Sequence, residues 1–187
     1  MRIISGKYKG KKILEPKDKL TRPLKDLTKE SIFNVLDHSN LININLRKSN
    51  VLDLFSGVGS FGLECISRGA LSVTFYENYP NAVKILRSNI TNISAQKKVS
   101  LFENDIFKEK SLKLLDLKFQ IIFIDPPYKE KKINNLLNKI YNLKLLEKNG
   151  ILIIHRHKKD KDKFPKEFNV IKEKTYGISK VIFLVIF

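Results

Sequence analysis

The sequence predicts a doubly wound α/β fold built on a mostly parallel sheet, and three observations support this prediction. Short apolar runs of strand length alternate with longer segments in which apolar residues recur at helical spacing, as in successive βαβ units. A glycine-rich segment directly follows the first of these runs, as in nucleotide-binding sheets. The last two apolar runs are separated by too few residues to hold a helix, so we expect them to form an antiparallel hairpin.

Seven strands are expected in all. They are Val51–Phe55, Val73–Glu77, Val99–Glu103, Ile121–Asp125, Ile151–His155, Val170–Glu173 and Val181–Phe187. Helices are expected shortly after Pro23 and at Phe61–Arg68, Pro80–Ile93 and Lys131–Leu146, the last closed by Asn149-Gly150. We expect residues 1–26 to form a short basic N-terminal extension, folded as a β-hairpin with turns at Gly6 and Gly10, and residues 27–187 to form the main domain.

The charge of the chain indicates a folded protein with a polyanionic partner. There are 36 Lys and Arg residues against 19 Asp and Glu, a net charge of +17, while apolar residues still make up 42% of the chain. A positive excess of this size attracts nucleic acid, because each neutralised phosphate releases condensed counterions. An AT-rich genome, which encodes Lys, Asn and Ile wherever the fold tolerates them, would give a similar composition, so both explanations stay open.

Several classes of site are disfavoured. Cys65 is the single cysteine, so neither an intramolecular disulfide nor a cysteine metal cluster is expected. The histidines lack further ligands at metal-binding spacing, and we expect His155 and His157 at a strand end among lysines, with no metal bound. No apolar run approaches the roughly 20 residues that span a bilayer, and the N-terminus lacks the apolar segment of a signal peptide. We therefore expect a cytoplasmic protein that contacts no membrane.

The glycine-rich segment is a candidate cofactor site. Gly57, Gly59 and Gly62 fit the G-x-G-x-x-G pattern of dinucleotide-binding folds, and Glu77 ends the next strand, where a ribose-binding acid belongs. The acid that precedes the glycines within the strand, Asp53, would repel a pyrophosphate but could accept hydrogen bonds from an ammonium group. This favours S-adenosylmethionine over NAD. Asp105, after the third strand, is suited to an adenine amino group.

The tetrapeptide Asp125-Pro126-Pro127-Tyr128 directly follows the fourth apolar run, at the expected switch point of the sheet. Two prolines hold the backbone extended, and we expect their carbonyls to lack local amide donors. Asp125 and the Pro126 carbonyl could accept the two protons of an exocyclic base amine and aim its lone pair at a methyl group. The Tyr128 ring could stack on an extruded base.

These residues resemble the class I amino-methyltransferases, and the resemblance extends over almost the whole chain to the RsmD family of small-subunit ribosomal RNA guanine-N2 methyltransferases. The matching segments are Arg2 to Ile13, Arg22-Pro23, Glu30 with Phe33-Asn34, Asp53 to Gly62, Ser67 to Ala70, Asp125 to Tyr128 and Tyr176-Gly177. The block from Gly6 to Ile13 is the most specific to this family. The Asp-Pro-Pro-Tyr motif is shared with DNA adenine and cytosine methylases.

The resemblance implies a Rossmann-like class I methyltransferase that uses S-adenosylmethionine to methylate a guanine N2 of 16S ribosomal RNA, in the small subunit or its assembly intermediate, and that we expect to be a monomer. Catalysis is assigned to Asp125, Pro126, Pro127 and Tyr128. The expected cofactor-binding residues are Asp53, Phe55, Ser56, Gly57, Gly59, Glu77, Asn78, Asp105 and Ile106. The expected RNA-binding residues are Lys7, Lys9, Lys11, Lys12 and Arg22.

Alternatives remain at this stage. A DNA amino-methyltransferase would normally need a target-recognition domain, for which the chain has little room. A non-catalytic RNA-binding module would not need the Asp125–Tyr128 geometry, and a nicotinamide-dependent oxidoreductase would not need the motif at all. The sequence also departs from the family, because Leu27, Thr28 and Lys29 stand where further arginines are usual. This leaves open how those RNA contacts are made.

Overall fold

The computed structural model describes residues 1–16, 24–108 and 111–186. Its helices are α1 (Asp26–His38), α2 (Ser60–Ser67), α3 (Pro80–Asn92) and α4 (Ile133–Asn142), with short 3-10 turns at Leu46–Lys48, Gln96–Lys98 and Leu112–Leu114. Its strands are β1 (Asn50–Leu54), β2 (Ser72–Tyr76), β3 (Val99–Phe102), β4 (Phe119–Ile124), β5 (Leu146–His157), β6 (Phe168–Tyr176) and β7 (Ser179–Ile186).

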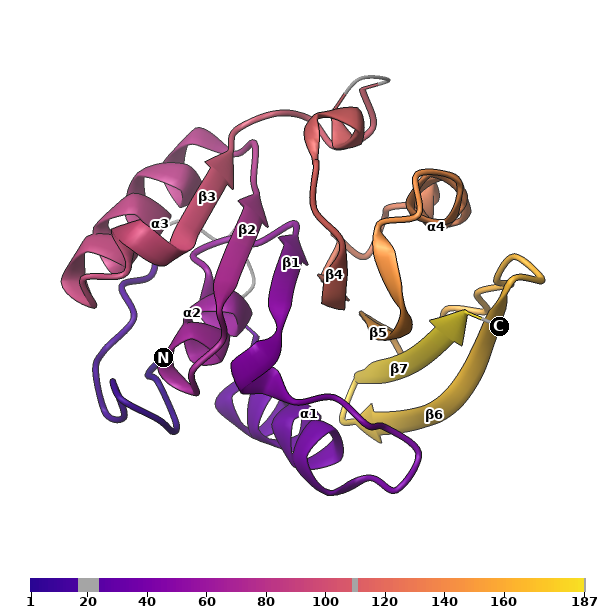
Figure 1. Ribbon diagram of the computed structural model, residues 1–187, viewed down its shortest axis with the longest axis horizontal. Coiled ribbons are helices and arrows are strands. Elements are labelled where there is room, and N and C mark those ends of the chain that lie inside the picture. The colour runs from indigo at the N-terminus through magenta and orange to yellow at the C-terminus, as the bar shows by residue number, and fades with distance from the viewer. Residues whose placement is uncertain (17–23, 109–110, 187) are drawn as a thin grey trace.

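The strands form one seven-stranded sheet in the order β3-β2-β1-β4-β5-β7-β6 (Figure 1). All pairs from β3 to β5 are parallel, whereas β7 pairs antiparallel with both β5 and β6. This confirms the doubly wound sheet, the seven strands and the C-terminal hairpin. The strand order reverses between β1 and β4, so the switch point lies where these two neighbours end.

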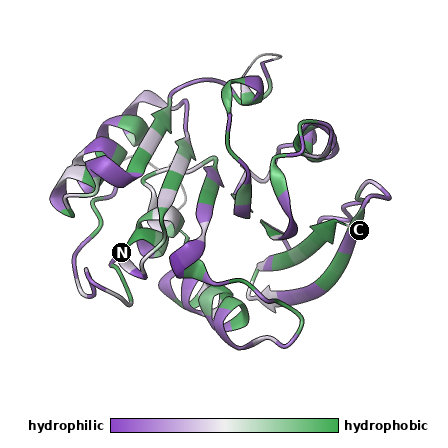
Figure 2. Cartoon of the chain, viewed as in Figure 1, coloured by the Kyte–Doolittle hydropathy of each residue, from purple (hydrophilic) through white to green (hydrophobic). Residues whose placement is uncertain are grey.

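Helices cover both faces of the sheet. Alternate residues of each strand enter two separate cores, as β4 shows: Ile121 and Phe123 join the core under α1, α2 and α3, and Ile122 and Ile124 join the core under α4. The apolar strands therefore lie inside two polar-faced helical layers (Figure 2). Stacked rings of Phe33, Phe61 and Phe123 join α1, α2 and β4 on the first face.

The predicted end of the last helix was wrong. The structure ends α4 at Asn142, where Lys144 adopts a φ of +52° and the Leu145 amide donates back to the Ile140 carbonyl over 3.1 Å. Leu146 already belongs to β5, and Asn149-Gly150 lies inside that strand and not after the helix. The leucines after the helix fit its apolar period in sequence, but Leu143 and Leu145 lie in the connection and Leu146 is the first residue of β5.

The N-terminal segment, residues 1–16, lies against the main domain. A single antiparallel bridge joins Arg2 to Lys12, and the buried side chains of Ile3 and Ile13 enter the first core. The Glu64 carboxylate of α2, which is fully buried, accepts the amides of Ile4 and Ser5 at 2.7 and 2.9 Å. The segment is thus held by internal groups of α2 as well as by its own bridge.

A buried cation completes this attachment. Lys29 of α1 is fully buried, and its Nζ donates to the Arg2 carbonyl at 2.8 Å and to Ser60 Oγ at 3.2 Å. It lies 3.9 Å from the Glu64 carboxylate, which is also paired with Arg68 at 2.9 Å. Burial lowers the pKa of Lys29, while the charges of Glu64 and Asp26 oppose that shift.

Candidate functional site

The predicted site residues meet where β1 and β4 end. Leu54 and Ile124 are paired neighbours in these parallel strands, and the Asp125 amide donates to the Leu54 carbonyl over 3.2 Å. The glycine loop after β1 and the Asp125–Tyr128 motif after β4 therefore leave the sheet side by side. This is the switch point, where open α/β sheets bind their ligands.

The three glycines of the loop have different neighbours. A side-chain carbon on Gly57, whose φ is +55°, would meet nothing within 4 Å. One on Gly59 would lie 2.4 Å from the Leu86 side chain, and one on Gly62 would lie 2.3 Å from the Phe75 ring. Packing against the Phe75 ring thus requires Gly62, the φ of +84° favours glycine at position 59, and Gly57 faces open space. Of these three glycines, Gly57 is the one beside open space, which a side chain would fill and which a ligand could occupy.

Asp53 supports the loop from beneath. It is 1% exposed, and its Oδ2 accepts the Gly62 amide at 2.9 Å, at the start of α2. Burial raises the pKa of Asp53 well above its usual value; the Gly62 hydrogen bond opposes this shift, and the charges of Asp125 and Glu77 add to it. The site therefore concentrates three carboxyl groups, which suits a cationic ligand and disfavours a pyrophosphate.

Glu77, just beyond β2, binds the loop from the other side. Its Oε2 accepts the Gly57 amide at 2.7 Å, and its Oε1 accepts the amides of Asn78 and Tyr79 at 2.9 and 2.8 Å. A carboxylate has about four acceptor positions, so three backbone donors leave capacity for one further hydroxyl. The carboxylate thus both orders the glycine loop and keeps one acceptor position for a ligand.

Ser56 and Phe55 complete the loop. The Ser56 amide donates to the Tyr76 carbonyl at 3.0 Å, and its hydroxyl oxygen accepts the Tyr76 amide at 3.1 Å, so the loop is joined to the end of β2. Phe55 adopts a φ of +59°, and its ring lies 5.9 Å from that of Phe107, centre to centre. The backbone at Phe55 thus takes a left-handed conformation that is unusual for an aromatic residue.

The third candidate carboxylate occupies a turn after β3. Asp105 Oδ1 accepts the Phe107 amide at 2.9 Å, and Ile106 is 4% exposed and belongs to the core under α4. Phe107 in turn lies under the Lys132 ammonium, 5.4 Å from its ring centre. The turn therefore presents Asp105 beside a small aromatic surface made by Phe55 and Phe107.

Asp125 has a partner that sequence reasoning missed. His155 Nδ1 lies 2.8 Å from Asp125 Oδ1, and the two side chains are 12% and 22% exposed. His155 was expected only as a strand-end residue among lysines. The register could have found it: Ile154 of β5 pairs with Ile124 of β4, so His155 and Asp125, each one position further along, come to lie next to one another.

The two prolines differ in their surroundings. Pro126 is buried, and its carbonyl accepts no hydrogen bond from the residues that the structure describes. Pro127 is exposed, and its carbonyl accepts the Glu130 amide at 2.8 Å, which corrects the expectation that neither carbonyl has a local donor. The acceptor platform therefore consists of Asp125 and the Pro126 carbonyl, while Pro127 closes the turn.

The motif ends in an aromatic pair. The rings of Tyr128 and His157 pack edge to face, with their centres 5.2 Å apart and their planes at 75°. Tyr128 is half-buried. His157 is the last residue of β5, so this strand supplies a neighbour both to the carboxylate and to the tyrosine of the motif.

The expected RNA-binding lysines lie elsewhere. Lys7, Lys9, Lys11 and Lys12 are exposed, but the Lys7 amide is bound to the Ser67 carbonyl and Lys11 Nζ to the Asn92 carbonyl, at the ends of α2 and α3. A helix that follows a parallel strand returns to the opposite edge of the sheet. These lysines are therefore roughly one helix length, about 12–20 Å, from the Asp125 edge.

Two further expectations concerned residues near α1. Arg22 lies outside the described residues. Lys29, one of the three residues for which the resemblance implied arginines, is fully buried between the N-terminal segment and α2, so it contacts internal groups and not a bound RNA. Thr28 is 3% exposed, and Leu27 is 72% exposed. At position 29, the difference from the family pattern therefore concerns a buried side chain that packs inside the protein.

Two hollows of about 580 and 550 Å³ flank the N-terminal segment, one along α1 and one beside residues 42–47. Neither is lined by a residue of the switch-point site, so we do not associate them with its chemistry. Within residues 1–16, 24–108 and 111–186, no group of three or more Asp, Glu, His or Cys side chains could hold a metal ion. In the same part of the chain, no helix has the length and apolarity needed to cross a membrane.

Comparisons with known proteins agree with this geometry. The family model described as Conserved hypothetical protein 95 matches residues 1–185. The chain is 32% identical to the Bacillus subtilis protein named "Putative rRNA methyltransferase YlbH", covering 97% of this chain and 96% of that one. It is 31% identical to the Buchnera aphidicola "Ribosomal RNA small subunit methyltransferase D", over 92% and 86% of the two chains. A solved structure, "Putative methyltransferase yhhF from Escherichia coli", shares the fold, with a TM-score of 0.79, 21% identity and coverage of 98% and 96%.

Proposed function

Because the chain belongs to the family described as Conserved hypothetical protein 95, the family of the RsmD-type enzymes, we propose that it methylates the exocyclic N2 of one guanine in 16S ribosomal RNA. S-adenosylmethionine is the methyl donor, and the small ribosomal subunit or its assembly intermediate is the substrate. The names of the relatives support ribosomal RNA as the acceptor. The observation that carries the proposal is the pair of acceptors, Asp125 and the Pro126 carbonyl, beside the glycine loop.

The cofactor fits the residues at the switch point. Gly57 leaves open space for a ligand to approach the backbone, and Glu77 keeps an acceptor position for a ribose hydroxyl. Asp53 and its neighbouring carboxylates favour a sulfonium and an ammonium group over a pyrophosphate. We assign the adenine amine to Asp105, whose carboxylate accepts the Phe107 amide beside the rings of Phe55 and Phe107. When bound, S-adenosylmethionine supplies the methyl group, and every other requirement of the reaction falls to the protein.

The protein prepares the base amine for attack. The guanine N2 lone pair is delocalised into the ring, so the amine is a poor nucleophile until its protons are held out of the ring plane. Asp125 and the Pro126 carbonyl accept these two protons, and the lone pair then points toward the methyl group. As the N–C bond forms and the S–C bond breaks, the amine gains a positive charge, and one of its protons leaves toward Asp125.

His155 is a positioning residue in this scheme. With its proton on Nδ1, the ring donates to Asp125 Oδ1 over 2.8 Å, so the carboxylate is held with its other oxygen free to accept from the base. Tyr128, whose ring packs against that of His157, provides the surface on which the extruded base stacks. The strand β5 thus fixes both side chains of the motif that contact the base.

The proposal is tested by methylation of small-subunit particles from cells that lack the protein, followed by mass spectrometry of the nucleosides. We expect N2-methylguanosine with the wild type. Asp125→Ala should slow single-turnover methylation by about two orders of magnitude, as for the loss of one preorganised hydrogen-bonding group, with a much smaller effect on cofactor binding. Asp116→Ala is the matched control, because Asp116 is exposed and precedes β4. Methylation of another base atom, or of no base, would refute the proposal.

A further inference from the structure

The segment between β5 and β6, residues 158–167, carries charges of both signs that differ in exposure. All five of its lysines are exposed, whereas its three acidic side chains are half-buried. The lysines are Lys158, Lys159, Lys161, Lys163 and Lys166. None of these ammonium groups forms an ion pair with a residue in the described ranges. We call this segment the lysine loop.

The aspartates of the lysine loop are neutralised from inside the protein. Arg156 of β5, which is 5% exposed, lies 3.3 Å from the Asp160 carboxylate and 3.2 Å from the Asp162 carboxylate. Lys180 of β7 also donates to the Asp160 carbonyl at 2.9 Å. Because the two acids pair with a buried arginine, they do not cancel the lysines on the outer surface. The loop therefore presents an almost purely cationic face.

The first part of the lysine loop lies beside the predicted base site. It begins directly after His157, whose ring contacts Tyr128, and the Lys158 amide is bound to the Ile178 carbonyl of the neighbouring hairpin at 2.9 Å. At about 3.8 Å between consecutive Cα atoms, Lys158 and Lys159 follow within about 8 Å of His157 along the chain. Phosphates that flank a base stacked on Tyr128 are within reach of long lysine side chains at this position.

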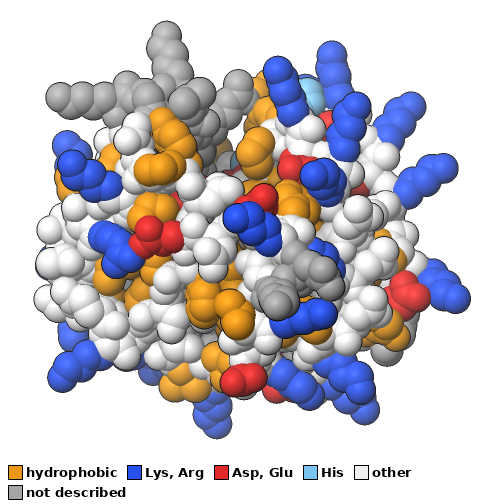
Figure 3. Space-filling view, turned by 90° about the horizontal axis from the view of Figure 1, so that it is seen from above, with side chains coloured by type: hydrophobic (Ala, Val, Ile, Leu, Met, Phe, Trp, Pro, Cys, Tyr) orange, Lys and Arg blue, Asp and Glu red, His pale blue; other side chains and the backbone are white. Residues whose placement is uncertain are grey.

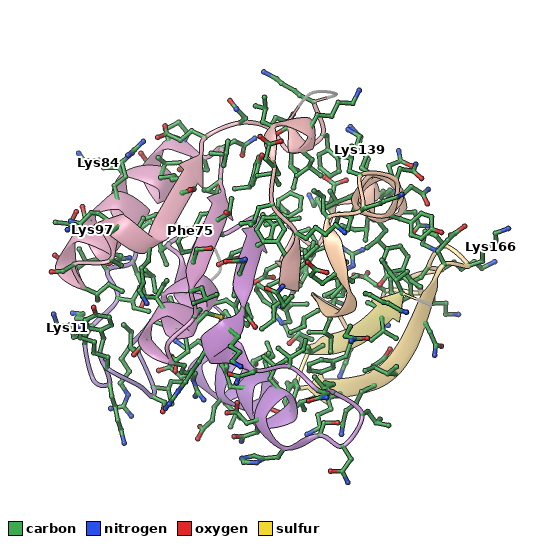
Figure 4. All side chains as sticks on the ribbon, viewed as in Figure 1. Lys11, Phe75, Lys84, Lys97, Lys139 and Lys166 are labelled. Atoms are coloured by element: carbon green, nitrogen blue, oxygen red, sulfur yellow. The ribbon has the colours of Figure 1, made fainter. Side chains whose placement is uncertain are left out.

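The lysine loop is separate from the N-terminal lysines. Figure 4 places Lys11 and Lys166 at opposite sides of the molecule. Figure 3 shows several Lys and Arg side chains gathered around a histidine at one corner of the face that it views. The N-terminal lysines are at the ends of α2 and α3, whereas the lysine loop starts at the carboxyl end of β5. Of these two groups, the lysine loop is the nearer to the predicted chemistry, at the edge of the sheet where Lys129 also follows Tyr128.

We propose that the lysine loop binds the phosphate backbone of the RNA strand whose guanine enters the site, through Lys158, Lys159 and Lys161. This inference rests on the proposed function for the identity of the RNA. The contacts that bind RNA independently of its sequence would then lie at the same edge of the sheet as Asp125. The Arg156 pairs keep the loop in shape while leaving its lysines available to the phosphates.

The test is binding of the full chain to 16S ribosomal RNA over a range of KCl concentrations. Each phosphate contact with a single strand contributes about 0.7 to the slope of log affinity against log salt, so replacing Lys158, Lys159 and Lys161 by Gln should reduce the slope by about 2. If the electrostatic part vanishes near 1 M salt, this corresponds to an affinity loss of about 50-fold at about 0.15 M. The same three positions changed to Arg should bind like the wild type.

The matched control replaces Lys97, Lys118 and Lys148 by Gln. These three lysines are as exposed as those of the loop, and their replacement removes the same charge. They lie just before β3 and β4 and early in β5, at the amino edge of the sheet. The proposal is overturned if the loop variant keeps the wild-type slope, or loses no more than the control. Cofactor affinity and melting temperature, measured on each variant, show that the fold is intact.

The outcome also separates this inference from the proposed function. If the loop variant binds and methylates as the wild type does, the lysine loop is only a solvated surface and the methyltransferase assignment stands. If the wild type binds the RNA through the loop but methylates none of its bases, the proposed function fails while the phosphate contact stands. Binding and methylation are therefore measured on the same preparations.

Discussion

The contact between His155 and Asp125 gives a sharp kinetic prediction. The Nδ1 to Oδ1 distance is 2.8 Å, and both side chains are largely buried, so the interaction is a hydrogen bond to a charged acceptor. Such bonds contribute about 1.5–3 kcal/mol. Since each 1.36 kcal/mol of barrier is tenfold in rate, His155→Leu should slow methyl transfer by about 10- to 150-fold.

Two further substitutions test whether the hydrogen bond itself matters. The amide nitrogen of Asn can take the position of Nδ1, so His155→Asn should retain most of the rate. The amide of Gln reaches the position of Nε2, which does not face Asp125, so His155→Gln should be as slow as His155→Leu. Because the residue acts through Asp125, the loss should appear in the rate of single-turnover methylation and not in cofactor affinity or RNA binding.

The assay is single-turnover methylation of small-subunit particles at saturating enzyme and cofactor, with calorimetry of cofactor binding and thermal denaturation in parallel. A merely structural histidine would lower the melting temperature and impair Asn and Gln variants alike. Equal rates for these two variants, or a wild-type rate for His155→Leu, would refute the positioning role.

Two other predictions concern the cofactor loop. Gly62→Ala should destabilise the fold by about 1–3 kcal/mol, because the new carbon would lie 2.3 Å from the Phe75 ring. Gly57→Ala meets no neighbour, but it puts a side chain at a φ of +55°, which costs about 1–2 kcal/mol, and it should also weaken cofactor binding more than Gly62→Ala does. Denaturation and calorimetry measure the two effects, and a wild-type cofactor affinity of Gly57→Ala would contradict the role given to the open space at Gly57. Burial raises the pKa of Asp53, so this carboxyl contributes stability that is fully present below its unfolded pKa and is lost as pH rises through its folded pKa. Asp53→Asn should therefore gain stability relative to the wild type as pH rises from acidic to neutral, and melting curves with no such trend would show that Asp53 titrates normally.

Local sequence signals predicted the sheet well, and they predicted that the glycine loop and the Asp125–Tyr128 motif would lie side by side. Strands bounded by glycine loops and the Asp125–Tyr128 motif have fixed places in a parallel sheet, so the meeting of β1 and β4 followed from chain order alone. The same reasoning could not find the Asp125 to His155 contact, because it depends on the register between β4 and β5. The twelve-residue length of β5 was also missed, since its first half reads as the end of a helix.

Long-range pairing explains the other differences. The sequence left open how Lys29 is used, and in the structure it is buried, donates to the Arg2 carbonyl and lies 3.9 Å from the Glu64 carboxylate. No local pattern in the sequence indicates that Asp160 and Asp162 of the lysine loop pair with Arg156, as they do in the structure. Composition gives the number of charged side chains. Whether each one faces solvent or pairs inside the protein depends on partners that are distant in sequence.

The attachment of the N-terminal segment has a consequence for the order of events during synthesis. Its amides and carbonyls are bound by Glu64, Ser67 and Asn89, which are 59 to 75 positions later in the chain. At roughly 5–20 residues per second, the ribosome needs about 3–15 s to deliver these partners. The same Asn89 side chain also donates to the Val58 carbonyl in the glycine loop, so neither the first residues made nor the cofactor loop can complete these contacts before the chain has been made to position 89.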